Sequence, residues 1–492
     1  MSMNLRSVGG NALSILTSDV LNRAASFVLY AMVARRLGAF EFGQMALALS
    51  LFYMFQVSAV AGLKILIVRQ VAKDRSQTRM YFNNGCAIVA VSSFTSVAAL
   101  FLFVRLMHYS PATNWIVLLL SLGLFPYAIS SVCEGIFQAW EKMQYIAWVN
   151  VPANIAKMAG AYLLLARGRG LYTVILVLLT AFFAVALAEV WLVLNRLPAQ
   201  QAAPVSLRFC WTTLRSSVTF LAIDKVIAIE SSLNIILLSK LATETEVGLY
   251  SAATQLLVPL VLVYQSIAQS IFPVMCRGVG AGFQDLKRIA EQALELLLAL
   301  AVPAAAGVFF LGPWGLALLY KNPAFLQAVP ALRVLAWTLI FQVFSYVLGQ
   351  VLVATHREKV TLRIVIVDVL ITLLAGTFLI DRFGLLGAAM TLFLTRLAAA
   401  IQHYVPVSRL LSGMPLGKIT WRPVVAASCM ATYLAVAKEQ ASILRMASAT
   451  LIYGAALLTL AVLACGGVRE LRDRFFYAWF GSRSGGHEEI GL

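Results

Sequence analysis

The sequence predicts an all-α polytopic membrane protein of about fourteen transmembrane helices, with two six-helix lobes in a parallel pseudo-twofold repeat and two extra C-terminal helices. Three observations predict this class: the composition, a series of long apolar segments and an internal repeat. Of the 492 residues, 61% are hydrophobic and 12% are charged, and the mean hydropathy is +0.86. A chain of this composition is not an ordinary soluble domain.

The apolar segments have the length that a bilayer requires. The first is too long for a signal peptide, contains charged residues and lacks a small-residue cleavage site, so we interpret it as a retained span. If the amino terminus is cytoplasmic, the connecting segments on the cytoplasmic side carry far more Lys and Arg than those on the outer side. This asymmetry predicts that both termini lie in the cytoplasm. The predicted spans are 11–35, 41–65, 82–105, 115–136, 145–166, 171–194, 216–240, 247–275, 289–311, 326–353, 360–380, 384–408, 423–437 and 446–465.

The two halves of the chain align with each other without gaps over long stretches. A shift of 205 positions pairs Asp19 with Asp224, Glu41 with Glu246 and Gly43 with Gly248, and a shift of 216 positions aligns 149–178 with 365–394. Acidic residues are rare in this sequence, so their coincidence indicates a duplicated unit. Because each unit has an even number of spans, both have the same orientation.

The repeat predicts four parts of the chain. The N-terminal six-helix lobe covers 1–197, a cytoplasmic amphipathic linker covers 198–215, and the C-terminal six-helix lobe covers 216–411. Residues 412–492 then form two extra transmembrane helices and a cytoplasmic tail. The linker contains prolines and basic residues, which is typical of an interfacial helix on the cytoplasmic leaflet.

Charged residues inside the spans are the first candidates for function. Asp19 and Arg23 are four positions apart on one helical face and can pair there. Charged groups persist within a bilayer by pairing across the bundle or by lining a wet cavity, and both interpretations stay open. If they line a wet cavity, the cations predicted to contact an anion are Arg23, Lys157, Lys225, Arg333 and Arg396. The acids available for ion coupling are then Asp19, Asp224, Glu230 and Asp368.

Uncharged polar residues form a second candidate set. Asn150 and Asn154 precede Lys157 at helical spacing, which gives one polar stripe along the fifth span. Gln255 and Gln269 lie in the eighth span, which two prolines can kink. Amide groups suit sugar hydroxyls and equally serve helix packing.

Motifs for catalysis are missing from the sequence. The string GMPLGKIT at 413–420 fails as a P-loop, and no HExxH or GxSxG occurs. The six cysteines lie singly, without the spacing of a metal or redox site. We therefore predict a protein that is not an enzyme and has no cofactor or metal. The net charge of +17 is spread along loops, so topology explains it better than nucleic-acid binding does.

Three segments carry a resemblance to a known family. They read ARRLGAFEFGQMALALSLFYMFQVSAVAGLKILIVRQVAKD, LLSKLATETEVGLYSAATQL and RFGLLGAAMTL. Together with the hydropathy layout of nearly the whole chain, they resemble the bacterial polysaccharide transporter family, the lipid-linked O-antigen and exopolysaccharide repeat-unit flippases of the MOP exporter superfamily.

This resemblance implies two lobes around a central cavity that work by alternating access on an undecaprenyl-diphosphate-linked oligosaccharide. It further implies a bacterial inner-membrane location, a monomer, membrane lipids as surroundings, and a polysaccharide polymerase and a chain-length regulator as partners. A multidrug or ion antiporter of the same fold is the alternative. A membrane polysaccharide polymerase or ligase is the less favoured one, because such enzymes usually carry a large outer loop, which this sequence lacks.

Overall fold

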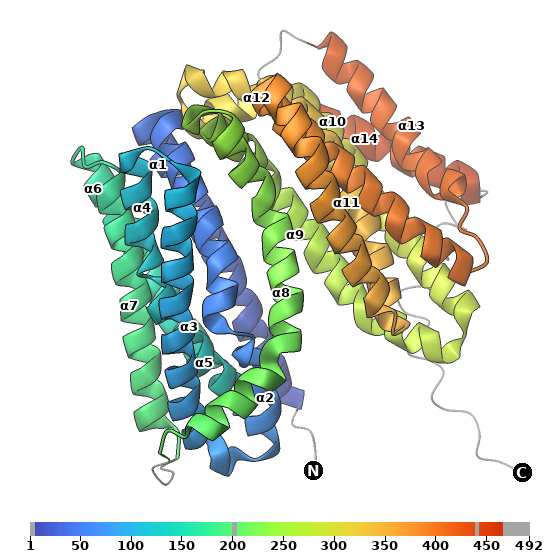
Figure 1. The fold of residues 1–492 in the computed structure, drawn as a ribbon. Coiled ribbons are helices and arrows are strands. Elements are labelled where there is room, and N and C mark those ends of the chain that lie inside the picture. Colours follow the sequence, from blue (N-terminus) through green and yellow to red (C-terminus); the bar gives the residue numbers. More distant parts are fainter. Residues whose placement is uncertain (1–4, 199–203, 438–441, 466–492) are drawn as a thin grey trace, which may run out of the picture. The chain divides into compact units, whose positions relative to one another are not determined.

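The protein is helical throughout its described part. The computed structural model describes residues 5–198, 204–437 and 442–465, and within them it contains fourteen α-helices, two short 3₁₀ helices and no strand (Figure 1). The all-α class predicted from the sequence is confirmed. Long helices with few polar interruptions are expected where a lipid core leaves backbone groups no water to bind.

The first part of the chain contributes eight α-helices. α1 is interrupted at Gly38, which has a φ of 86°. The helices of this part are α1 (Leu5–Val60), α2 (Leu63–Lys73), η1 (Arg75–Gln77), α3 (Thr78–Met107), α4 (Pro111–Ser121), α5 (Leu124–Ala139), α6 (Gln144–Ala166), α7 (Leu171–Arg196) and α8 (Leu207–Leu241). α8 runs without a break through the predicted linker end at 215.

The rest of the chain contributes six α-helices. α12 is interrupted at Gly384, which has a φ of 52°. The helices of this part are α9 (Glu244–Ala281), α10 (Phe283–Tyr320), η2 (Pro323–Ala328), α11 (Val329–Ala354), α12 (Glu358–Leu410), α13 (Leu416–Val436) and α14 (Ser442–Cys465).

Ten helical stretches among the described residues are long and apolar enough to cross a membrane. Two of them, Asn22–Lys73 and Glu358–Leu410, have 52 and 53 residues, more than twice the ~20 residues of one crossing. α6 and α8 have the length of spans but carry more polar and charged side chains, and they are not among the ten. The predicted number of fourteen spans stays a prediction.

Two of the predicted spans are broken. The segment 41–65 is interrupted at Ala61 and Gly62, both with positive φ, so that α1 ends and α2 begins there. A Cβ on Gly62 would lie 2.8 Å from the backbone nitrogen of Leu221, so the close approach of α8 also requires glycine. The segment 115–136 is interrupted at Leu122–Gly123, between α4 and α5.

The internal repeat is visible in a pair of helix caps. The Oε2 atom of Glu41 accepts a hydrogen bond of 3.2 Å from the N–H of Leu171, at the start of α7. The Oε1 atom of Glu246 accepts one of 3.0 Å from the N–H of Leu385, directly after the interruption in α12. A carboxylate at the N-terminus of a helix satisfies a free N–H group and interacts favourably with the helix dipole. Two acids that the sequence alignment pairs therefore cap one helix each.

The chain divides into two compact units. The first comprises Met1–Leu256, Leu316–Ala331 and Leu362–Thr395, and the second comprises Leu257–Gly315, Leu332–Thr361 and Arg396–Leu492. In the first unit α1 contacts α3, α4, α5, α6, α7 and α8. In the second unit α13 and α14 pack on each other and on Leu311 of α10. The four-part division predicted at 197, 215 and 411 stays a prediction.

Candidate functional site

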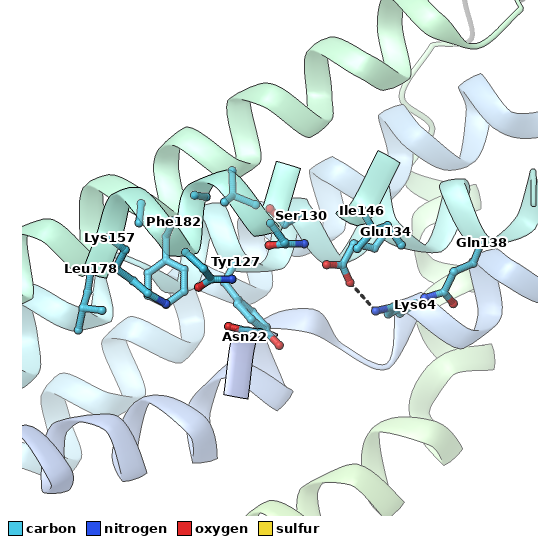
Figure 2. A pocket seen from close by; sticks show the side chains of 15 residues that line it. Asn22, Lys64, Tyr127, Ser130, Glu134, Gln138, Ile146, Lys157, Leu178 and Phe182 are labelled. Carbon is cyan, nitrogen blue, oxygen red and sulfur yellow. Dashed lines mark hydrogen bonds and ion pairs between the residues drawn. The ribbon is translucent and has the colours of Figure 1, made fainter. Parts of the chain in front are cut away.

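The first unit contains a polar cavity of about 380 Å³. Residues from α1, α2, α5, α6 and α7 form its wall, and most of those that Figure 2 labels are polar. The lining residues are Asn22, Lys64, Tyr127, Ser130, Glu134, Gln138, Ile146, Asn150, Ala153, Asn154, Lys157, Leu178, Ala181, Phe182 and Val185. We call this space the first cavity.

α6 supplies two of the four amide groups and one of the two cations that line the first cavity. Asn150, Asn154 and Lys157 follow each other at one face of this helix, and all three line the cavity. Asn154 is buried, whereas Lys157 is half-buried. The polar stripe that the sequence indicates thus faces a space large enough for several water molecules or part of a ligand.

An ion pair between α2 and α5 also lines the first cavity. The Lys64 Nζ atom is 2.5 Å from the Oε2 atom of Glu134, and Figure 2 shows this pair between α2 and α5. The two side chains are 34% and 23% exposed. Lys64 belongs to the first turn of α2 because the break at Ala61–Gly62 restarts the helix there. A cation in this turn is disfavoured by the helix dipole, and Glu134 offsets that cost.

A second cavity of about 260 Å³ adjoins the first at this ion pair. Lys64, Tyr127, Ser130 and Glu134 line both spaces. On the far side of the ion pair the second cavity reaches Gln56 and Gly62, together with Asp224 of α8. The Lys64–Glu134 pair therefore lies where two polar spaces of the first unit meet.

A fully buried carboxylate lies behind the ion pair. Glu189 of α7 is 0% exposed and lies beside the hydroxyl of Ser130, although no hydrogen bond of regular geometry joins the two side chains. Glu134 and Lys64 are close enough to influence it electrostatically. Ser130 itself is 7% exposed and lines both cavities.

A third cavity of about 290 Å³ is polar but uncharged. α1, α8 and α9 line it, and the predicted lining residue Gln255 supplies the amide group among its described lining residues. Its other polar residues are Tyr30, Ser50, Tyr53, Ser231, Ser232, Ser251 and Thr254.

The remaining predicted residues lie apart from the first cavity. The ammonium of Lys225 donates to the Met54 carbonyl at 3.0 Å and to the Ser58 hydroxyl at 2.7 Å, so it joins α8 to α1. Arg23 and Gln269 are exposed. Arg333 is exposed and lies 5.3 Å over the ring of Phe309.

The predicted acids whose side chains the structure describes also lie outside the lining of the first cavity. Asp224 lines the second cavity, Glu230 is half-buried and Asp368 is 4% exposed. Arg396, the last predicted cation, is half-buried. The side chain of Asp19 lies outside the described residues, so its pairing with Arg23 stays a prediction. Within the described chain, no group of three or more His, Cys, Asp and Glu is placed to hold a metal.

Sequence reasoning missed Lys64, Glu134 and Glu189. All three lie near the ends of predicted spans, where charges are usually solvated at the membrane surface. One signal was available, because Glu189 lies inside the apolar run AFFAVALAEVWLVL. The break at Gly62, which turns Lys64 toward the cavities, depends on packing against α8 and is not encoded in a local motif.

Comparison with known proteins identifies the family. The model of a family described as polysaccharide biosynthesis protein matches residues 8–279, more than half of the chain. The chain belongs to this family. A second family model, MatE, matches residues 226–377. The chain is also 20% identical over 398 residues to a probable low-salt glycan biosynthesis flippase, Agl15, of Haloferax volcanii, a match that covers 80% of this chain and 82% of the relative.

Solved structures establish the fold as that of MOP transporters. The inward closed conformation of the lipid II flippase MurJ matches with a TM-score of 0.73 at 13% identity, over 95% of this chain and 99% of MurJ. An inward-facing multidrug resistance MATE transporter of the MOP superfamily matches with a TM-score of 0.67 at 14% identity, over 80% of this chain and 94% of that protein. At these identities the likeness concerns the fold alone.

Proposed function

We propose that this polysaccharide biosynthesis family member is a flippase for lipid-linked oligosaccharides. The observation that carries the proposal is the chemistry of the first cavity, where three asparagines, a glutamine, hydroxyl groups and two lysines share one wall. Amides and hydroxyls exchange hydrogen bonds with sugar hydroxyls, and lysines offset the charge of a diphosphate. The relative from Haloferax volcanii, a probable glycan biosynthesis flippase, supports the same substrate class.

In this proposal the sugar head group crosses through polar spaces while the lipid tail stays in the membrane. The protein alternates between states that open to either side, as transporters of this fold do. Lys157 and Lys64 meet the phosphate charge, and the amides of α6 meet the sugars. Arg23, Lys225, Arg333 and Arg396 remain proposed anion contacts, and Asp19, Asp224, Glu230 and Asp368 remain proposed ion-coupling groups.

The membrane potential supplies a driving force for this transport. At about 2.3 kcal/mol per charge per 100 mV, moving about two negative charges out of a cell that is negative inside gains roughly 4 to 5 kcal/mol. Transport of a diphosphate therefore requires no ATP-hydrolysing site.

The finer parts of the proposal concern the biological setting. The substrate is an undecaprenyl-diphosphate-linked repeat unit of O-antigen or exopolysaccharide, and the location is the bacterial inner membrane with both termini in the cytoplasm. The protein acts as a monomer and delivers its product to a polysaccharide polymerase and a chain-length regulator.

A transport assay tests the proposal. The full-length protein is reconstituted into liposomes that contain an undecaprenyl-diphosphate-linked disaccharide with a fluorescent label on the sugar. We expect the label of the inner leaflet to become accessible to a membrane-impermeant quencher much faster than in protein-free liposomes. Equal rates in both preparations would refute the flippase proposal.

A multidrug or ion antiporter is the second candidate, because the MatE model matches part of the chain. The same liposomes distinguish the two candidates when a cationic dye replaces the labelled glycolipid. Export of the dye driven by a proton or sodium gradient, without movement of the glycolipid, would select the antiporter.

A further inference from the structure

Resting on the flippase function proposed above, we propose that the third cavity binds one uncharged sugar of the lipid-linked oligosaccharide and selects against acidic sugars. The cavity lies between α1, α8 and α9 of the first unit. Its ligand class is a neutral pyranose, such as a hexose or an N-acetylhexosamine, as opposed to a uronic acid. The first cavity, with its two lysines, is a separate space.

The size of the third cavity fits a single sugar ring. Its volume is about 290 Å³. This equals the space of roughly ten water molecules at ~30 Å³ each. One pyranose with its hydroxyl groups fits into such a space, whereas a whole repeat unit does not. The cavity therefore distinguishes one sugar of the oligosaccharide.

The two halves of the internal repeat line this cavity with different chemistry. Three of its positions on α1 correspond to three on α9 in the register of 205 positions. These pairs are Ala46 and Ser251, Leu49 and Thr254, and Ser50 and Gln255. At the first two pairs α9 has a hydroxyl where α1 is apolar, and at the third it has an amide where α1 has a hydroxyl. A sugar ring, which has an apolar face and polar edges, matches a cavity whose sides differ in this way.

α1 gives the cavity an aromatic side. Tyr30, Phe42 and Tyr53 line it together with Met45 and Leu49. The rings of Tyr30 and Phe42 pack edge to face with their centroids 6.3 Å apart, so each holds the other in place. An aromatic ring offers a flat apolar surface to the C–H groups of a sugar face, and a tyrosine adds a hydroxyl group.

α8 and α9 give the cavity its hydrogen-bonding side. Ser251 is 8% exposed, and its hydroxyl has no hydrogen-bond partner among the described residues. A buried hydroxyl of this kind calls for a partner within the cavity. Ser231 and Thr254 donate to carbonyls of their own helices, so their oxygens can still accept. Gln255 adds an amide that both donates and accepts, as sugar hydroxyls do.

Charge separates this cavity from the other two. None of its described lining residues is charged, whereas Lys64 and Glu134 line both the first and the second cavity. Lys225 of α8 does not line it and donates to α1 instead. A carboxylate brought into such a space loses its hydration and gains no counter-ion, while a neutral sugar exchanges one set of hydrogen bonds for another. The third cavity therefore favours neutral sugars.

Transport of two matched glycolipids tests this site in liposomes without a membrane potential. Both are undecaprenyl-diphosphate-linked monosaccharides, one with glucose and one with glucuronic acid, so they differ only at C6. Flipping is measured by mass spectrometry as the fraction that external, membrane-impermeant periodate oxidises with time. We expect the wild type to flip the glucose form at least about tenfold faster than the acid form.

Gln255→Lys should change this preference, because it places a cation in the cavity. We expect the ratio of the two rates to fall at least about tenfold. A loss of folded protein would slow both substrates alike and would leave the ratio unchanged. Gln327→Lys is the matched control, since Gln327 is an exposed residue of η2 outside the third cavity. It adds the same charge and should keep the wild-type ratio.

Equal wild-type rates for the two glycolipids, or a faster acid form, would overturn the neutral-sugar site and leave the flippase proposal standing. An unchanged ratio in Gln255→Lys, with a wild-type unfolding midpoint, would also overturn the site. The flippase proposal fails separately, when neither glycolipid moves faster than in protein-free liposomes.

Saturation-transfer NMR tests the sugar class without transport. The full-length protein is placed in nanodiscs of phosphatidylcholine, and the probes are methyl glucoside and methyl glucuronide at equal concentration. We expect saturation to reach the glucoside more strongly than the glucuronide, and this difference to disappear in Gln255→Leu and in Ser251→Ala. Equal transfer to both probes in the wild type, or a difference that both variants retain, would reject the site.

Discussion

Gly43 of α1 and Gly248 of α9 pack backbone to backbone, each against the preceding turn of the other helix. A Cβ on Gly43 would lie 1.8 Å from the carbonyl oxygen of Glu244, and a Cβ on Gly248 would lie 1.9 Å from that of Ala39. The sequence register of 205 positions pairs Gly43 with Gly248 and Ala39 with Glu244. Each half thus contributes the same turn to the contact, as expected where a pseudo-twofold axis passes between repeats.

This contact predicts that Gly43→Ala and Gly248→Ala are both destabilising. A methyl group at either position forces the two backbones apart, and overpacking of this kind costs about 1–3 kcal/mol or more. The measurement is the midpoint of thermal unfolding of the detergent-purified protein, and we expect both variants to unfold at a lower temperature than the wild type.

Gly417→Ala is the control for this pair. Gly417 lies in α13, and a Cβ there meets nothing within 4 Å. This variant should unfold at or slightly above the wild-type temperature, because alanine favours the helix. Equal behaviour of all three alanine variants would contradict the close contact.

The two caps predict a loss of stability in both halves when either carboxylate is removed. Glu41→Ala and Glu246→Ala each remove the carboxylate that accepts the first N–H of a helix, from Leu171 and Leu385 respectively. The loss of an N-terminal cap costs about 0.5–2 kcal/mol. We expect both unfolding midpoints to fall, and that of Glu246→Ala to fall further, because Glu246 also accepts hydrogen bonds from the N–H and the hydroxyl of Thr243. A wild-type midpoint in either variant would contradict its cap.

Much of the fold could be predicted from the sequence because its signals are local or repeated. Long apolar segments have few alternatives to helices in lipid, and the rare acids Glu41 and Glu246 revealed the repeat in a sequence rich in chance apolar matches. The breaks at Ala61–Gly62 and Leu122–Gly123 could not be predicted. They depend on how neighbouring helices approach, as the contact of Gly62 with α8 shows.

The candidate site was only partly predictable for the same reason. The stripe of Asn150, Asn154 and Lys157 follows from helical spacing alone, and these residues share a cavity. Lys64 and Glu134 are 70 positions apart, so only the packing of α2 on α5 brings them together. For Lys225 the sequence predicted contact with an anion, whereas in the structure its ammonium donates to a carbonyl and a hydroxyl of α1.

The first cavity predicts a specific transport defect in Lys157→Ala. Loss of this ammonium removes one of the two cations from the cavity wall, while its half-exposed position makes a large loss of stability unexpected. We expect flipping of the labelled glycolipid in liposomes to slow at least tenfold, which corresponds to about 1.4 kcal/mol of lost stabilisation.

Lys418→Ala is the matched control for this variant, since Lys418 is an exposed lysine of α13 outside the cavities. It should flip the glycolipid at the wild-type rate. Wild-type transport by Lys157→Ala, at normal protein levels in the membrane, would remove Lys157 from the site.

The Lys64–Glu134 pair predicts different outcomes for stability and for transport. Lys64→Met leaves Glu134 without its partner, and this costs roughly 1–3 kcal/mol, less than for a fully buried pair because both side chains are partly exposed. The exchanged variant with Lys64→Glu and Glu134→Lys keeps the opposite charges together and should recover most of the unfolding midpoint. It places a carboxylate at the start of α2, where the proposed substrate diphosphate binds, so its rate of glycolipid flipping should stay as low as that of Lys64→Met. Recovery of transport along with stability would show that the pair serves only to join α2 to α5.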